Sequence, residues 1–123
     1  MTFFHIPLLE YEYAGDNSRT GDMFEGVYHA DINSGLFAAF LATKHTVASF
    51  LGHDHVNDYC GLYPSQAGMW ACYGGGVGYG TYGREGWERR ARVIEITQNG
   101  SGVTTHKRLD NEELTVIDVQ TLL

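Results

Sequence analysis

Short apolar runs alternate with polar and glycine-rich stretches along the chain, a pattern that predicts a mixed α/β fold. Residues 2–9 form the first apolar run, and because Pro7 interrupts it we expect a buried strand that ends near His5. The run TVASFL at 46–51 predicts the next strand. Between them, LFAAFLAT at 36–43 has apolar residues on most faces, which predicts a well-buried helix.

The segment before this helix predicts a long loop. Residues 14–34 are rich in Gly, Asp, Asn and Ser and show little periodicity. An irregular segment of roughly twenty residues inside a small domain usually has a function or acts as a lid. Asn33 or Ser34 should cap the helix that follows.

The second half of the chain predicts strands joined by turns. One pair is expected at 59–63 and 69–73 with a turn at 64–68, and a hairpin at 91–97 and 103–109 with a turn at 99–102. The order strand, helix, strand and then several strands favours an α/β sandwich whose site lies at strand ends. We expect one domain over residues 1–123.

Composition and charge narrow the classes of function. Hydrophobic residues make up 43% and charged residues 19%, which is typical of a globular protein. The net charge of −7 argues against non-specific binding to nucleic acid or to anionic membrane, because the basic residues do not form a stripe beyond Arg89, Arg90 and Arg92. The sequence has no signal-peptide pattern and no apolar run that approaches the ~20 residues of a membrane span, so we expect a soluble chain.

The two cysteines do not suggest a disulfide framework. Cys60 and Cys72 are too few for the bridged scaffold of a small secreted protein. The favoured interpretation is a pair of buried thiols that act as small apolar groups, and a single bridge is the alternative.

Histidines provide the strongest chemical signal. His53 and His55 follow a predicted strand, and in extended backbone their Cα atoms would lie about 6.6 Å apart on one side. Imidazole nitrogens bind zinc-like metals at about 2.0–2.1 Å, so two such rings can share an ion or serve two neighbouring ions. Gly52 would let the backbone bend close to the site. His5 is the natural third ligand, because it also ends an apolar strand.

Charge limits what three imidazoles can do. They leave the charge of a divalent cation uncompensated, and a hydroxide-bridged pair of ions also needs carboxylates. We expect Asp54 to face away from the histidines, and no spacing supports the other nearby acidic residues, which are Asp58, Glu10, Asp31 and Asp16. The residues alone therefore leave two possibilities, a complete three-histidine mononuclear site or part of a dinuclear one.

The glycine-rich segment 74–83 contains a motif that is typical of dinucleotide-binding sites but lacks their structural context. Gly78, Gly80 and Gly83 satisfy GxGxxG, but a dinucleotide-binding site needs a helix directly after the motif, and here a strand follows. We instead expect these glycines to let the loop pass close to substrate or to other backbone. The following arginines, Arg84, Arg89, Arg90 and Arg92, are expected on a solvated strand edge.

Several blocks together resemble a known family. The segments FFHIPLLEY, NSGLFAAF, FLGHDHVNDYCG, GYGTYGREGWERRARVI and HKRLDNEELTVIDVQTLL are similar, in order and spacing, to the C-terminal part of purple-acid-phosphatase-like metallophosphoesterases of the calcineurin-like superfamily. The resemblance implies a two-sheet β-sandwich flanked by helices with two metal ions (Fe, Zn or Mn) at strand ends. It also implies hydrolysis of phosphate monoesters by water that the two metals activate.

The resemblance also assigns roles to residues. His5 and His53 would bind one ion and His55 the other, while Asn57 and Asp58 are candidates to orient the rings by hydrogen bonds. The family motifs that supply carboxylates precede the matching region and have no counterpart here, so we expect a truncated phosphoesterase whose partner is the missing N-terminal half of the domain. The alternatives are a self-sufficient mononuclear hydrolase and a non-catalytic remnant that binds a partner.

Overall fold

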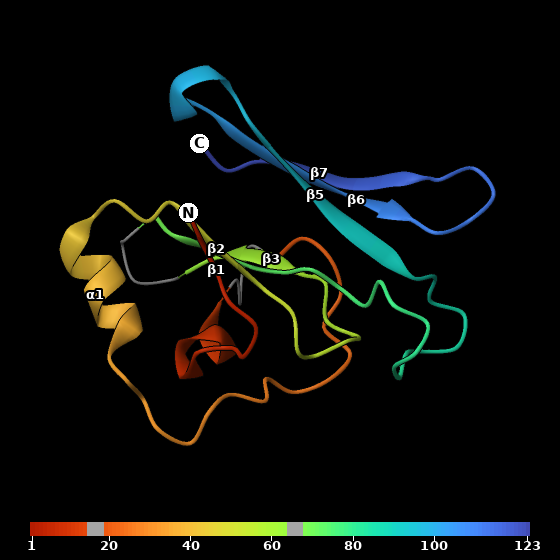
Figure 1. The fold of residues 1–123 in the computed structure, drawn as a ribbon, viewed down its shortest axis with the longest axis horizontal. Coiled ribbons are helices and arrows are strands. Elements are labelled where there is room, and N and C mark those ends of the chain that lie inside the picture. The colour runs from red at the N-terminus through yellow and green to blue at the C-terminus, as the bar shows by residue number, and fades with distance from the viewer. Residues whose placement is uncertain (15–18, 64–67) are drawn as a thin grey trace.

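The computed structural model describes residues 1–14, 19–63 and 68–123, which form two β-sheets and one α-helix (Figure 1). The four-stranded sheet has the order β1-β2-β4-β3, with bounds Thr2–Phe3, Ala48–Leu51, Trp70–Tyr73 and Cys60–Leu62. The α-helix α1 spans Leu36–Thr43. A 3-10 helix, η1, spans Leu9–Tyr13. The expected mixture of α and β structure is confirmed, although the described residues contain one α-helix rather than several.

Parallel pairing organises the four-stranded sheet. β2 pairs in parallel with β1 on one side and with β4 on the other, while β3 joins β4 antiparallel. Because parallel strands run in the same direction, the C-terminal ends of β1, β2 and β4 lie side by side at one end of the sheet. The predicted site residues that follow β1 and β2 therefore lie at this end, as expected for ligand sites of open sheets.

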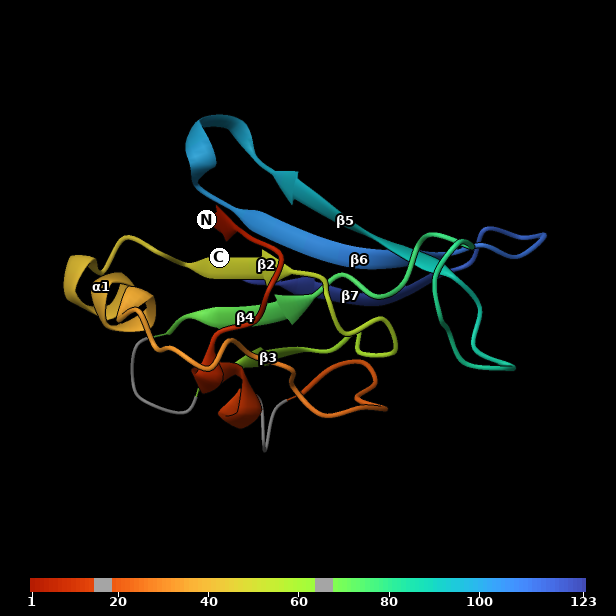
Figure 2. The ribbon, with the colours of Figure 1, turned by 60° about the horizontal axis from the view of Figure 1, so that its bottom comes forward.

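The C-terminal part forms a three-stranded antiparallel sheet that packs on the first (Figure 2). Its strands are β5 (Arg90–Ile96), β6 (Val103–Leu109) and β7 (Val116–Thr121), and the 3-10 turn η2 (Gln98–Gly100) joins the first two. Buried apolar residues fill the interface between the sheets, namely Ala48, Phe50, Cys60, Cys72, Val103 and Leu122. Trp70 Nε1 also donates a hydrogen bond across it to Leu122 O at 3.1 Å.

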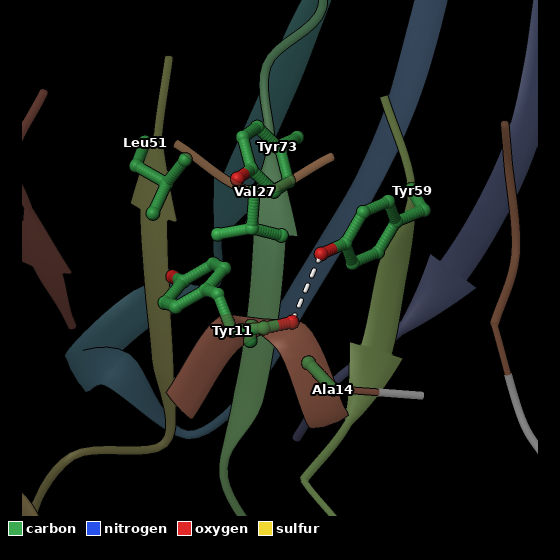
Figure 3. Packing of buried hydrophobic residues seen from close by; sticks show 7 residues of the cluster. Tyr11, Ala14, Val27, Leu51, Tyr59 and Tyr73 are labelled. Carbon is green, nitrogen blue, oxygen red and sulfur yellow. Dashed lines mark hydrogen bonds between the residues drawn. The ribbon is translucent and has the colours of Figure 1, made fainter. Parts of the chain in front are cut away.

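A second core, rich in tyrosine, lies on the other face of the four-stranded sheet (Figure 3). Each buried hydroxyl has a partner: Tyr11 Oη donates to Ser49 O at 3.1 Å, Tyr59 Oη to Tyr11 O at 3.1 Å, and Tyr73 Oη to Asp54 Oδ2 at 2.5 Å. Burial raises the pKa of Tyr11 and of Tyr73, and the bond to Asp54 raises that of Tyr73 further. The phenols of Tyr11 and Tyr73 are therefore neutral donors, as buried hydroxyls need to be.

Most predicted elements are confirmed, with corrections at the first strand and the C-terminus. The helix, the strand at 46–51, the pair at 59–63 and 69–73, and the hairpin at 91–109 are all present, whereas residues 64–67 of the predicted turn lie outside the described residues. The prediction for the first strand was wrong in length and in burial. β1 has only two residues, and Phe3 is 63% exposed. β7 was not predicted, because its residues do not alternate cleanly between apolar and polar.

Two predictions about the helix are also wrong. α1 buries only Phe37 and Phe40, which pack against Met69, so one face of the helix is buried and the rest is exposed. Its N-cap is Gly35 with a φ of 75°, a left-handed conformation that glycine adopts without steric cost. Asn33 stabilises the turn before the helix instead, since its Oδ1 accepts a hydrogen bond from Gly35 N at 2.8 Å.

The cysteines also differ from the favoured interpretation. Cys60 and Cys72 are directly opposite on β3 and β4, and the structure joins them in a disulfide. Cys60 makes its backbone hydrogen bonds on its other side, with Thr20. The two cysteines therefore form a non-hydrogen-bonded cross-strand pair, the arrangement in which side chains lie closest.

A buried ion cluster ties the loop after β2 to the C-terminal sheet. Asp58 is fully buried, and its Oδ2 accepts from Arg90 Nη1 at 2.9 Å and from Lys107 Nζ at 2.7 Å. Lys107 also pairs with Asp118 of β7. Arg92 Nη2 donates to Asp58 O at 2.6 Å, and burial lowers the pKa of Arg92 to about 10, which still leaves it charged at neutral pH.

This cluster corrects the prediction of a solvated strand edge for Arg90 and Arg92, whereas Arg84 is exposed as expected. Arg90 is 3% exposed and Arg92 is half-buried, so both hold the two sheets together rather than lining a wet surface.

None of the helices in the described parts of the chain is long and apolar enough to cross a membrane.

Asp58→Asn should destabilise the chain strongly, because it leaves the buried cations Arg90 and Lys107 without the carboxylate between them. Breaking a buried ion pair from one side costs about 3–5 kcal/mol. The free energy of unfolding in urea measures the loss, with Asp110→Asn, at an exposed carboxylate, as the control. An unfolding free energy for Asp58→Asn equal to that of the control would contradict the assignment.

Candidate metal site at the strand ends

Two imidazoles meet where β1 and β2 end. His5 follows β1 and Gly52 follows β2, and the parallel register pairs Phe3 with Phe50 just before them. A Cβ placed on Gly52 would lie 3.4 Å from His5 Nδ1, so the ring of His5 sits directly over this glycine. The rings of His5 and His53 are 5.3 Å apart, centroid to centroid, and nearly perpendicular at 84°.

The loop that carries the histidines turns sharply instead of continuing the strand. His53 has a φ of 74°, a left-handed conformation that is uncommon for a residue with a side chain. Asp54 N donates to Gly52 O at 3.0 Å and Asn57 N to Asp54 O at 3.3 Å, which closes two tight turns. The spacing argument for extended backbone was therefore wrong, and it is the turn that brings His53 next to His5.

His55 faces a different neighbour. Its ring stacks on Tyr82 at 4.2 Å with an interplanar angle of 15°, and its Nδ1 lies 3.3 Å from Tyr82 O. The structure thus brings together two of the three predicted ligands and holds the third against the glycine-rich loop. Within residues 1–14, 19–63 and 68–123, no three His, Cys, Asp or Glu side chains form a group that could hold a metal ion.

Asp54 faces away from the histidines, as the sequence predicted. It is 2% exposed, and its Oδ2 accepts from Tyr73 Oη and, at 3.2 Å, from Tyr28 N. This carboxylate anchors the loop to β4 and to the preceding segment, so it is not available to a metal. Asp16, another acidic residue considered from the sequence, lies outside the described residues.

Asn57 and Asp58 hold the loop rather than the rings. Asn57 is fully buried, and its Oδ1 accepts from Phe24 N at 3.0 Å and Glu25 N at 3.1 Å. Asp58 Oδ1 accepts from Asp22 N at 2.7 Å. The bonds described for these two side chains go to backbone and to the ion cluster, so their effect on the imidazoles runs through the shape of the loop.

The glycine-rich loop packs closely on the histidine loop. A Cβ on Gly76 would lie 2.8 Å from His55 O, closer than real Cβ contacts allow. The three motif glycines do not make the expected approach to backbone, because a Cβ on Gly78 or Gly80 would meet nothing within 4 Å and one on Gly83 would meet the Arg89 side chain. Arg89 holds the loop folded by donating to Thr81 O at 2.7 Å and to Tyr82 O at 2.9 Å.

Sequence reasoning missed Glu25 and Tyr82. Glu25 Oε1 accepts from Val56 N at 3.0 Å, and Tyr82 Oη donates to the same carboxylate at 2.9 Å. The segment 14–34 was predicted to be a functional loop, and its described part lies against the histidine loop through a bridge between Met23 and Asn57. The prediction of a functional loop thus indicated the right segment, but nothing in the sequence identified Glu25 within it.

Comparison with known proteins finds relatives that are named as phosphatases. The chain is 44% identical over 131 residues to probable inactive purple acid phosphatase 28 of Arabidopsis thaliana, a match that covers 99% of this chain and 32% of that protein. It is 42% identical over 132 residues to probable inactive purple acid phosphatase 29 of the same plant. Phosphatase DCR2 of Saccharomyces cerevisiae is 39% identical over 132 residues, which cover 100% of this chain and 23% of that protein.

The chain spans about a third of the length of the two plant relatives and less of the yeast one. No family model matches the chain. No solved structure matches it either. The relationship to purple-acid-phosphatase-like proteins therefore rests on sequence identity along almost the whole chain.

Gly76→Ala should disturb the histidine loop, because the added methyl group would collide with His55 O. Overpacking of this kind costs about 1–3 kcal/mol. Gly78→Ala is the matched control, since it lies in the same loop and a Cβ there meets nothing within 4 Å. Urea unfolding of both variants compares them, and equal stabilities would show that the loop does not press on His55.

Proposed function

Because the chain is related over almost its whole length to purple-acid-phosphatase-like proteins, we propose that it carries the histidine side of a phosphoesterase metal centre. In this proposal His5 and His53 bind one divalent or trivalent cation and His55 binds a second. The reaction is hydrolysis of phosphate monoesters. Fe, Zn and Mn are the candidate metals.

The observation that carries the proposal is the approach of His5 to His53 across parallel strand ends. Their ring centroids are 5.3 Å apart, and imidazole nitrogens bind zinc at about 2.0–2.1 Å, so the two rings are close enough to share one ion. The left-handed backbone of His53 supports the same role, because unfavourable backbone conformations gather at functional sites.

The position of His55 favours two ions over one. Its ring is held by Tyr82 rather than by the other two histidines, and paired catalytic ions lie about 3.5–4 Å apart. The described residues form no group of three such ligands, so a single ion bound by all three imidazoles would require His55 to leave this stack. The dinuclear arrangement is therefore preferred to a self-sufficient mononuclear hydrolase.

Carboxylate ligands are proposed to come from a segment outside these 123 residues. Asp54 and Asp58, the carboxylates nearest in sequence to the histidines, are committed to Tyr73 and to the ion cluster. The plant relatives are about three times as long as the matching region. β1 is an edge strand with Phe3 largely exposed, and this is the surface on which we expect the remaining part of the domain to pack.

Each group has a defined task in this centre. Bound metal ions would lower the pKa of a water molecule and neutralise charge on the phosphate oxygens. The histidines of this chain hold the ions and are not nucleophiles. The tight turn at His53 and the anchoring of Asp54 keep the rings in place before a substrate arrives. The phosphate ester is the proposed partner, and the net charge of −7 makes nucleic acid and anionic membrane poor ones.

Zinc binding tests the shared site. His5→Ala and His53→Ala should each lower the zinc affinity by more than about tenfold, because loss of a ligand is at least as costly as loss of a group that orients one. Isothermal titration calorimetry at neutral pH measures this. His45→Ala is the control, since His45 is exposed beyond the end of α1. Equal affinities for all three variants and the unmodified chain would refute the proposed ligands.

Hydrolysis of p-nitrophenyl phosphate tests where the carboxylates come from. The 123-residue chain supplemented with Zn²⁺, Mn²⁺ or Fe²⁺ should hydrolyse the ester no faster than the metal salts alone. Robust turnover that disappears in His53→Ala would contradict the need for outside carboxylates. The same assay on a chain extended to the length of the relatives would decide between an active enzyme, as the yeast relative's name suggests, and an inactive one, as the plant names suggest.

A further inference from the structure

Tyr82 contacts His55 at three points. Its ring stacks on the imidazole at 4.2 Å, its hydroxyl oxygen accepts from His55 N at 3.1 Å, and its backbone oxygen lies 3.3 Å from His55 Nδ1. The contacts come from a loop that begins almost twenty residues further along the chain, so they fix the ring from outside its own turn.

The third contact determines which ring nitrogen carries the proton. A backbone carbonyl can only accept a hydrogen bond, so His55 Nδ1 must be the donor. In a neutral imidazole the other nitrogen, Nε2, then has a free lone pair. The carbonyl has two lone pairs, which allows it to accept from Arg89 Nη1 at 2.9 Å as well.

The hydroxyl of Tyr82 is itself held in place by Glu25. Tyr82 Oη donates to Glu25 Oε1 at 2.9 Å and to Oε2 at 3.1 Å, while Oε1 also accepts from Val56 N at 3.0 Å. An ionised carboxylate can only accept a hydrogen bond, so the proton stays on the Tyr82 hydroxyl. His55 N–H, Tyr82 O–H and the Glu25 carboxylate thus form a directed chain that ends on a charge, an arrangement stronger than neutral bonds.

We propose that Tyr82 is a positioning residue that holds His55 as its Nδ1–H tautomer and leaves Nε2 free to bind a divalent cation. This inference rests on the proposed metal function and adds to it the binding atom and the residue that sets it. Groups that accept a hydrogen bond from a metal-binding histidine fix its tautomer and orientation, and losing them typically costs about 10–100-fold in metal affinity.

Nitrogen-15 NMR of the histidine side chains tests the tautomer in the metal-free chain. The spectrum is recorded at pH 8, above the ordinary histidine pKa of about 6.5, and His55→Gln identifies the signal. The unmodified chain should show His55 protonated at Nδ1. Tyr82→Ala keeps the backbone oxygen but loses the ring and the hydroxyl that hold it against His55 Nδ1, so it should weaken this preference and bind Zn²⁺ about 10–100-fold more weakly.

Tyr79→Ala is the matched control, because Tyr79 lies in the same loop but its hydroxyl bonds to Asp110. It should leave the tautomer of His55 and the zinc affinity unchanged. Tyr82→Phe keeps the ring and the backbone oxygen and loses the hydroxyl, so it should retain the Nδ1–H tautomer and most of the affinity that Tyr82→Ala loses. A merely structural role for Tyr82 would not move the tautomer.

Two results would overturn the inference. One is Nε2–H protonation of His55 in the unmodified chain, a measurement that does not depend on any variant folding. The other is a folded Tyr82→Ala variant whose His55 tautomer is unchanged. If the tautomer behaves as expected but the unmodified chain binds no Zn²⁺, the proposed metal function fails while the assignment of Tyr82 as the group that fixes the ring stands.

Discussion

The parallel pairing of β2 with β1 and with β4 is the constraint on which the rest of the site depends. Phe4 N donates to Phe50 O at 3.2 Å on one side of β2, and Gly74 N donates to Leu51 O at 2.8 Å on the other. These bonds make three strands end together. His5, the histidine loop and the glycine-rich loop are neighbours for that reason alone, although they are far apart in the sequence.

Buried polar groups then determine the shape of the histidine loop. Asp54 ties it to the tyrosine core, and Asp58 ties it to Arg90 and Lys107 of the second sheet. Such groups stabilise little relative to apolar replacements, but they fix one geometry because each must find its partner. The loop is therefore clamped between both sheets, and the left-handed turn at His53 can be maintained at a site that needs it.

Patterns of apolar and turn residues along the sequence predicted most strands and the helix. They could not predict contacts between residues that are far apart in the sequence. The helix at 36–43 and the hairpin at 91–109 follow from apolar periodicity and turn residues. The proximity of His5 and His53 was expected from the strand ends and from the family resemblance. The spacing argument for His53 and His55 was wrong, since the backbone turns where an extended strand was assumed. Tyr82 and Glu25 could not be found, because their contacts with His55 and Val56 depend on how two distant loops fold.

The most direct test is the crystal structure of the zinc-loaded chain, with the metal located by anomalous scattering at the zinc edge. The account predicts a peak at about 2.0–2.1 Å from one ring nitrogen of His5 and one of His53. A zinc ion bound only by other side chains, with these two imidazoles free, would contradict it.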